Sequence, residues 1–148
     1  MSPIVDVVAP RLLGPAIVLA AAIIVRGYSD VGDGFSAAVI VALAIALRYL
    51  TLGPERAERS LPMLRQAPAI AIAGLLMALS AGFFGVPFGN PPFTHWPPPG
   101  EPVVTIGRLE IMTAVVFDLG LFLLVTGVLA VLIHHLSHTA RSARGSGE

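Results

Sequence analysis

The stretch that decides the fold of this 148-residue chain is IMTAVVFDLGLFLLVTGVLAVLI, residues 111–133, in which Asp118 is the only charged residue. A helix rises 1.5 Å per residue, so roughly 20 residues cross a hydrocarbon core of about 30 Å. Lipid offers no water to backbone amides and carbonyls, and each of these groups must be satisfied within the segment itself. The stretch is therefore expected to be a membrane helix.

Three further apolar runs precede this stretch, and most charges and prolines lie between them. The expected helices cover about residues 10–26, 34–52, 67–86 and 109–134. Together they predict an all-α membrane protein with four transmembrane helices in one domain, residues 1–136. The small, polar segment 137–148 is expected to be a disordered cytoplasmic tail.

Composition and charge exclude several classes of protein. Of all residues, 55% are apolar and 12% are charged, whereas about one quarter are charged in an ordinary soluble domain. Such a chain has too few polar residues for an enzyme. Nine acids balance nine scattered bases, so there is no basic patch for nucleic acid. Cysteine is absent, which excludes disulfides, iron–sulfur clusters and thiolate zinc sites; no cofactor is expected.

The distribution of arginine predicts the orientation in the membrane. Cytoplasmic loops of membrane proteins carry an excess of basic residues. In the expected four-helix topology, one side of the membrane has two arginines near the helix ends, Arg26 and Arg108. The other side, which includes both ends of the chain, has seven arginines: Arg11, Arg48, Arg56, Arg59, Arg65, Arg141 and Arg144. Both termini are therefore expected in the cytoplasm.

The two longer connections differ in character. Residues 53–62 alternate in charge between prolines and predict a short solvated link with about one helical turn. Residues 87–102 are rich in proline, which excludes a helix or an inner strand and favours extended polyproline-like geometry. Phe93, His95 and Trp96 in this outer loop are expected near the membrane interface. The loop is either an interfacial anchor or a docking element for a neighbouring protein.

Small residues recur at helical spacing in the last two apolar runs. Membrane helices associate through close backbone approach, so such stripes mark packing faces. The stripes are Gly74, Ala78 and Gly82 in one run and Thr113, Gly120 and Gly127 in the other. The partner helix belongs either to this chain or to a neighbour. Nothing in the four runs resembles a self-contained pore, which favours a subunit of a larger complex.

Asp118 is the main candidate for chemistry. An aspartate deep in a membrane helix costs about 2.5–3.5 kcal/mol on insertion scales, and the surrounding Leu, Ile, Val and Phe residues offset this by roughly 0.3–0.6 kcal/mol each. One interpretation is a proton or cation relay in a hydrated cavity. The other is a buried partner for Arg26 or for a neighbouring chain. The sequence is compatible with both interpretations of Asp118.

Two weaker patterns accompany it. The segment RGYSDVGDGF, residues 26–35, has the glycines of a tight turn and matches neither a nucleophile elbow nor an EF-hand loop. His134 and His138 are spaced i, i+4, as two ligands on one helix face would be. Because no glutamate lies between them and no cysteine lies nearby, no metal site is expected there.

Three segments resemble a known family. They are RLLGP at 11–15, RGYSDVGDGF at 26–35, and FDLG followed by FLLVTG within 117–127. Their order and content are similar to those of the MnhB/MrpB family, the B-type component of the Mrp-type multisubunit sodium/proton antiporters. The resemblance spans about residues 10–136. The last segment matches closely. The departures fall in the second segment, at Tyr28, Ser29, Val31 and Asp33.

This resemblance implies a small multi-pass subunit in the bacterial inner membrane, within a complex that exchanges Na+ for H+. Its partners would be large subunits similar to the proton-pumping chains of complex I and other small membrane subunits. Such a chain is needed for assembly and could line the cation path. The candidate ion-path residues are Asp118, Asp33 and Asp30. The motif and packing residues are Gly27, Gly32, Gly34, Phe35, Gly74, Gly82, Phe117, Gly120 and Gly127.

Two other roles are compatible with a small apolar chain. A structural component of a related complex, such as the antiporter module of a membrane-bound hydrogenase, would make no ion contact. A free-standing exporter of the small multidrug type would carry an acid in its first helix, and residues 12–25 contain none.

Overall fold

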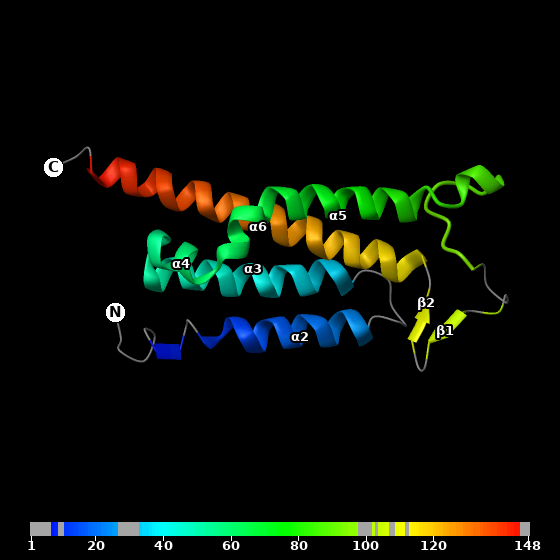
Figure 1. Cartoon of the computed structure of the whole chain (residues 1–148), viewed down its shortest axis with the longest axis horizontal. Coiled ribbons are helices and arrows are strands. Elements are labelled where there is room, and N and C mark those ends of the chain that lie inside the picture. Colours follow the sequence, from blue (N-terminus) through cyan, green and yellow to red (C-terminus); the bar gives the residue numbers. More distant parts are fainter. Residues whose placement is uncertain are drawn as a thin grey trace.

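In the part of the chain that the structure describes, four long helices form the body of the molecule (Figure 1). The computed structural model describes residues 7–8, 11–26, 33–97, 102, 104–106, 109–111 and 113–145. The long helices are α2 (Leu13–Arg26), α3 (Asp33–Leu52), α5 (Ala67–Gly82) and α6 (Thr113–Gly145). They run alternately in opposite directions, so the start of α2 and the end of α6 lie at the same end of the molecule.

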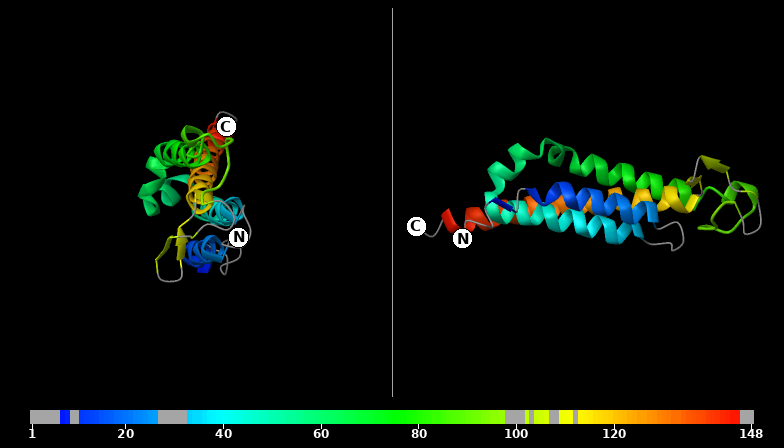
Figure 2. Two further views of the ribbon diagram at one scale, coloured as in Figure 1. Left: turned by 90° about the vertical axis from the view of Figure 1, so that its right-hand side faces the viewer. Right: turned by 90° about the horizontal axis from the view of Figure 1, so that it is seen from below.

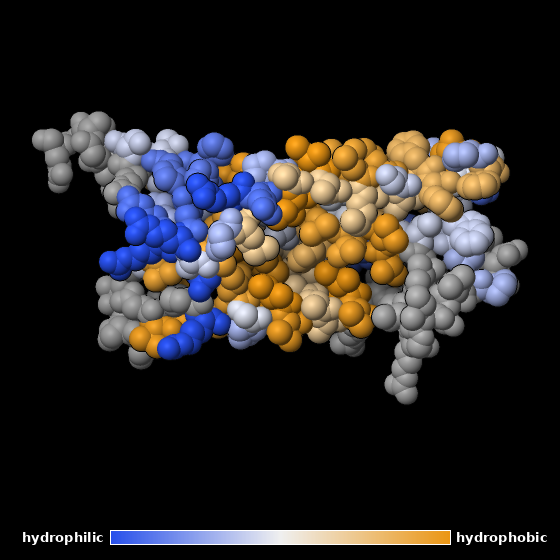
Figure 3. Space-filling view, in the orientation of Figure 1, coloured by the Kyte–Doolittle hydropathy of each residue, from blue (hydrophilic) through white to orange (hydrophobic). Residues whose placement is uncertain are grey.

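Three segments are long and apolar enough to cross a membrane. They are Asp33–Leu52, Pro62–Phe88 and Thr113–Ala140. The apolar part of α2, Leu13–Val25, is shorter, and its 14-residue helix is about 21 Å long at 1.5 Å per residue. An apolar band covers the middle of the molecule, and hydrophilic residues gather at the end where α2 begins and α6 ends (Figure 3).

The four helices stand in a row and do not form a closed bundle. Seen from the end, the order is α5, α6, α3, α2 (Figure 2). The most extensive contact joins α5 to α6, followed by the contacts of α3 with α6 and with α2, whereas α2 barely reaches α6. Much of the surface of α3 and α6 on either side of the row is therefore open to lipid or to other chains, although the link that follows α3 covers part of it near the end of α6.

α3 is the central element of the hydrophobic core. Its buried side is made largely of small residues, which lets α2 and α6 approach closely; these are Gly34, Ala37, Ala38, Val41, Ala42, Ala44, Ile45 and Tyr49. Leu13 and Ala20 of α2 pack into the same cluster. Elsewhere on α3, Leu43 is 64% exposed and Leu50 is 71% exposed. The surfaces of α3 that face α2 and α6 are therefore packed, whereas the surface that carries these two leucines is largely exposed.

The link after α3 is more helical than the sequence predicts. Gly53 turns the chain at φ 76°, a left-handed conformation that favours glycine. A two-turn helix, α4 (Pro54–Ser60), and a 3-10 helix, η2 (Pro62–Gln66), follow it. Ala57 and Leu61 are buried in one cluster with Tyr49. This burial stabilises α4, and charge alternation alone does not reveal it.

The opposite end of the molecule also departs from expectation. A short 3-10 helix, η3 (Val86–Phe88), occupies the start of the segment in which no helix was expected; a proline is compatible with a first helical turn. Strands β1 (Val104–Ile106) and β2 (Leu109–Ile111) pair antiparallel, with Val104 opposite Ile111. The predicted helix start at residue 109 is therefore wrong, and α6 begins at Thr113.

Contacts with the outer loop explain where α6 begins. The backbone nitrogen of Trp96 donates to Oγ1 of Thr113 at 2.7 Å, and the backbone nitrogen of Thr113 donates to the Trp96 carbonyl at 3.1 Å. The second bond satisfies the backbone N–H of Thr113, which the first helical turn leaves without an intrahelical partner. The first bond holds Trp96 against the start of the helix.

α6 extends past the expected helix end near residue 134 and reaches Gly145, through most of the segment expected to be disordered. The polar side chains there form hydrogen bonds within the helix. Ser137, Thr139 and Ser142 donate to carbonyls three or four residues earlier, at 2.8, 2.9 and 3.2 Å. Polarity in this segment therefore does not end the helix.

Candidate functional sites

Asp118 lies where α3 crosses α6. It is 7% exposed and is the only buried charged side chain in the described part of the chain. By helical rise it lies about 8 Å from the start of α6. Its carbonyl group touches Gly34 of α3 so closely that a Cβ there would collide with the carbonyl oxygen. Gly34 thus sets how closely the two helices approach at Asp118.

The chain around Asp118 is held by aromatic contacts with the outer loop. The ring of Phe93 packs edge-on against that of Phe117, with the ring centroids 6.1 Å apart. It also packs at a tilt of 58° against the ring of Phe83 at the end of α5, with the centroids 5.5 Å apart. The backbone nitrogen of Phe93 donates to the Gly82 carbonyl at 2.6 Å. Phe93 therefore bridges the end of α5 and the first turns of α6, next to the buried acid.

Other residues of the glycine-rich motif fall in different places. Asp33 is partly buried in the first turn of α3, where the helix dipole favours a negative charge. Phe35 is 53% exposed. Gly27, Asp30 and Gly32 lie outside the described residues, as does the side chain of Arg26, the expected partner of Asp118.

The small-residue stripes meet each other within this chain. A Cβ on Gly120 would lie 2.6 Å from the backbone nitrogen of Ala78, and a Cβ on Gly127 would lie 2.7 Å from that of Ala71. Gly74 faces the backbone of Leu124 and Gly120 at similarly close range. These contacts form the α5–α6 seam: Ala67, Ala71, Gly74 and Ala78 against Gly120, Leu123, Leu124 and Gly127.

Two predicted members of the stripes lie outside the α5–α6 seam. Gly82 faces the ring of Phe93, and Thr113 binds the backbone of Trp96. Sequence reasoning also missed the stripe Gly34, Ala38, Ala42 on α3, although these buried residues recur every four positions as Gly74, Ala78 and Gly82 do.

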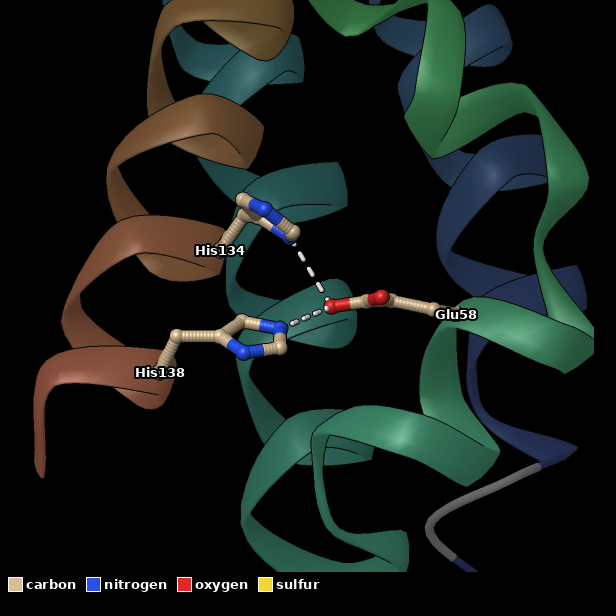
Figure 4. A group of neighbouring side chains, drawn as sticks. All are labelled: Glu58, His134 and His138. Carbon is tan, nitrogen blue, oxygen red and sulfur yellow. Dashed lines mark hydrogen bonds and ion pairs between the residues drawn. The ribbon is translucent and has the colours of Figure 1, made fainter. Parts of the chain in front are cut away.

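A second group of polar side chains gathers at the opposite end of α6 (Figure 4). Nδ1 of His134 and Nε2 of His138 each donate to Oε1 of Glu58 at 2.8 Å. The hydroxyl of Tyr49 donates to the same oxygen at 3.4 Å. We call Glu58, His134 and His138 the α4–α6 triad. The carboxylate comes from α4 and points across to two successive turns of α6.

Electrostatics keep Glu58 ionised. Partial burial by itself would raise the pKa of this carboxyl. The hydrogen bonds from His138 and His134, together with their charge, outweigh that effect and lower the pKa below its ordinary value of 4.5. Beside Glu58 and His134 lies a cavity of about 350 Å³, which Arg65 and His135 also line.

Sequence reasoning noticed the two histidines but not their carboxylate, because Glu58 is 76 residues away from His134 along the chain. The histidine spacing marked one face of α6, but no local pattern marks which acid folds against that face. The link between α3 and α5 carries only two acids, Glu55 and Glu58. Pairing each of these acids with the two histidines would have been a signal for the contact.

Comparison with known proteins gives consistent matches. Residues 4–131 match the model of a family described as a domain related to the MnhB subunit of Na+/H+ antiporter. The chain is 30% identical over 107 residues to the B-type Na(+)/H(+) antiporter subunit of Alkalihalophilus pseudofirmus, covering 72% of each chain. It is 32% identical over 111 residues to the B-type Na(+)/H(+) antiporter subunit of Bacillus subtilis, covering 72% of this chain and 73% of that one.

A third relative is much longer than this chain. The probable K(+)/H(+) antiporter protein of Rhizobium meliloti that carries the combined A/B designation is 32% identical over an alignment of 148 positions, which covers 90% of this chain but 14% of that protein. The chain thus spans about one seventh of that relative and nearly three quarters of the two shorter ones.

Proposed function

Because the chain belongs to the family of domains related to the MnhB subunit of Na+/H+ antiporters, we propose that it is a small multi-pass subunit of a multisubunit cation/proton antiporter in the bacterial cell membrane. The family match over residues 4–131 is the observation that carries this proposal. The relatives are named for exchange of Na+ or of K+ against H+, which supports one of these two ions as the proposed cation.

The proposed topology has four crossings with both ends in the cytoplasm. The arginine asymmetry favours this orientation, and the alternating directions of the four helices support an even number of crossings. α2 is short for a span, but Arg11 and Arg26 flank its apolar part. Arginine side chains near helix ends reach to the interface, and the bilayer thins locally around a short span at modest cost.

The open row of helices supports a role within a larger assembly. Large apolar side chains are exposed along it, including Val18 of α2 at 69%, Leu50 of α3 at 71% and Leu76 of α5 at 60%. Lipid covers such surfaces as well as protein does. A row that does not close, however, encloses no conduction path of its own among the described residues, so ions would move along a boundary with other subunits.

Asp118 is the proposed ion-contacting residue, with Asp33 and Asp30 as further candidates. A carboxylate in a membrane helix is expensive and marks ion or proton pathways when it faces a hydrated route. Its burial at the α3–α6 crossing supports this role. The same burial fits a structural role in which the acid only holds helices together, and the Asp118 substitution described below separates the two.

Loss and restoration of exchange test the proposed function. We expect everted vesicles from a strain lacking the chain to lose cation-dependent proton exchange, measured by quenching of a pH-sensitive dye on addition of Na+ or K+. Expression of the chain from a plasmid should restore the exchange. Unchanged exchange with both cations in the deletion strain, with the other subunits present, would refute the antiporter role.

A further inference from the structure

We propose that the α4–α6 triad of Glu58, His134 and His138 binds a divalent transition-metal ion such as Zn²⁺ and thereby fastens α4 to the end of α6. The proposal goes beyond the exchange function. His134 and His138 lie 16 and 20 residues along α6 from Asp118, about 24 and 30 Å by helical rise.

The ligand atoms already converge on one point. Each of the three residues offers one ligand atom, and these atoms all lie within 4.8 Å of one another. A tetrahedral zinc ion with bonds of about 2.0–2.2 Å holds its ligand atoms roughly 3.3 Å apart. Glu58 Oε1 lies 2.8 Å from each ring nitrogen. These two distances would have to lengthen by about 0.5 Å to admit the ion.

The positions of the ligands in the chain also suit a metal. His134 and His138 project from successive turns of one helix, with ring centroids 4.6 Å apart, and Glu58 approaches from a different helix. A site built from one helix face alone would lack this third, opposing ligand. Hydrogen bonds already orient both rings toward the carboxylate, so the ligand nitrogens are positioned before any ion arrives. To bind the ion, each of these nitrogens gives up its N–H proton, either to the other nitrogen of its ring by a change of tautomer or to solvent.

The donor set indicates which ions fit. Imidazole nitrogen suits Zn²⁺, Cu²⁺, Ni²⁺ and Co²⁺, whereas Mg²⁺ and Ca²⁺ prefer sites made of oxygen ligands. Three protein ligands leave a fourth position for water. The histidine side chains are 45% and 46% exposed and that of Glu58 is 29% exposed, so the ion can enter from solvent. Arg65 lines the adjoining cavity, and its charge weakens the affinity for a cation.

Metal binding would constrain the connection between two membrane helices. α4 follows α3 directly and leads through η2 into α5. An ion shared by α4 and α6 would therefore tie this connection to α6 at the end where the hydrophilic residues gather. It would restrain movement of α5 relative to α6 without touching the buried acid.

Zinc content of the purified complex tests the proposal. We expect the assembled complex containing the full chain, stripped of metal and dialysed against Zn²⁺, to bind one more equivalent per chain with the wild-type sequence than with His138→Ala or Glu58→Gln, as counted by elemental analysis. Glu58→Gln keeps a hydrogen-bond acceptor of the same shape but is a poor metal ligand, so it distinguishes a metal site from a hydrogen-bonded clamp. His135→Ala is the matched control, because His135 is the neighbouring histidine outside the triad and should leave the zinc content unchanged.

Equal zinc content in wild type and His138→Ala, or an equal loss in His135→Ala, would overturn the proposal. A measurement on the unaltered complex covers the case in which a variant fails to assemble. Co²⁺ added to the metal-free wild-type complex should give the visible absorption bands of a tetrahedral site, which Zn²⁺ then abolishes. Absence of such bands would also overturn the proposal.

Discussion

Among single residues, Asp118 is the one whose substitution distinguishes a role in ion transport from a role in helix packing. Asparagine preserves its shape and most of its hydrogen bonding but can neither carry charge nor exchange a proton. Because the substitution adds no volume at this buried position, we expect the Asp118→Asn complex to assemble at normal yield. We expect it to lose most cation-dependent proton exchange in everted vesicles, with Asp118→Glu restoring part of it.

Yield and exchange are measured on the same membranes, so a loss of activity can be compared with a loss of complex. Normal exchange by a fully assembled Asp118→Asn complex would leave Asp118 a structural role only. A loss of exchange in proportion to lost complex would lead to the same conclusion.

Gly34 gives a second prediction at this scale. A methyl group there would collide with the carbonyl of Asp118, and overpacking of a tight contact costs about 1–3 kcal/mol. We expect Gly34→Ala to lower the thermal stability of the detergent-solubilised complex. Gly14→Ala is the matched control, because nothing lies within 4 Å of a Cβ at Gly14. Equal stability of the two variants would show that the α3–α6 approach is looser than the structure indicates.

At the scale of helices, the α5–α6 seam depends on Gly120 and Gly127. A leucine at either position would push α5 away from α6, since membrane helices associate through close contact. We expect Gly127→Leu to reduce the yield of intact complex strongly, measured by size-exclusion chromatography. Val128→Leu should not, because Val128 is 42% exposed on the adjacent face. Normal yield with Gly127→Leu would exclude the α5–α6 seam as a packing interface.

The helices also show what a sequence can and cannot predict. All four helix interiors lie within the apolar runs, because length and hydropathy are properties of the run itself. The ends differ where a distant contact decides them. Thr113 starts α6 through its bonds to Trp96, and α4 forms where Ala57 is buried against Tyr49.

The candidate sites follow the same rule. The sequence marks Asp118 as a candidate because it is the lone acid of an apolar run, and its burial is what the structure adds. The α4–α6 triad was not, since its carboxylate comes from a residue 76 positions away from the nearer histidine.

At the scale of the whole molecule, the absence of cysteine from the sequence makes the topology directly measurable. Single cysteines at three exposed positions, Val7→Cys, His95→Cys and Ser142→Cys, can be labelled with a membrane-impermeant maleimide in intact cells. We expect labelling only at His95→Cys, with the other two positions reacting after the cells are opened. Labelling of Val7→Cys in intact cells would show that α2 does not cross the membrane, and labelling of Ser142→Cys would reverse the orientation.

The proposed function requires this chain to work as one of several subunits, so the proteins that it binds are its most direct test. The measurement is purification of the tagged chain in mild detergent, followed by mass spectrometry of the particle that carries it. We predict a single particle that contains the chain together with other small membrane proteins and at least one large one. Recovery of the chain alone or as a homodimer, under conditions that keep other membrane complexes of the same cells intact, would show that it is not a subunit of a larger complex.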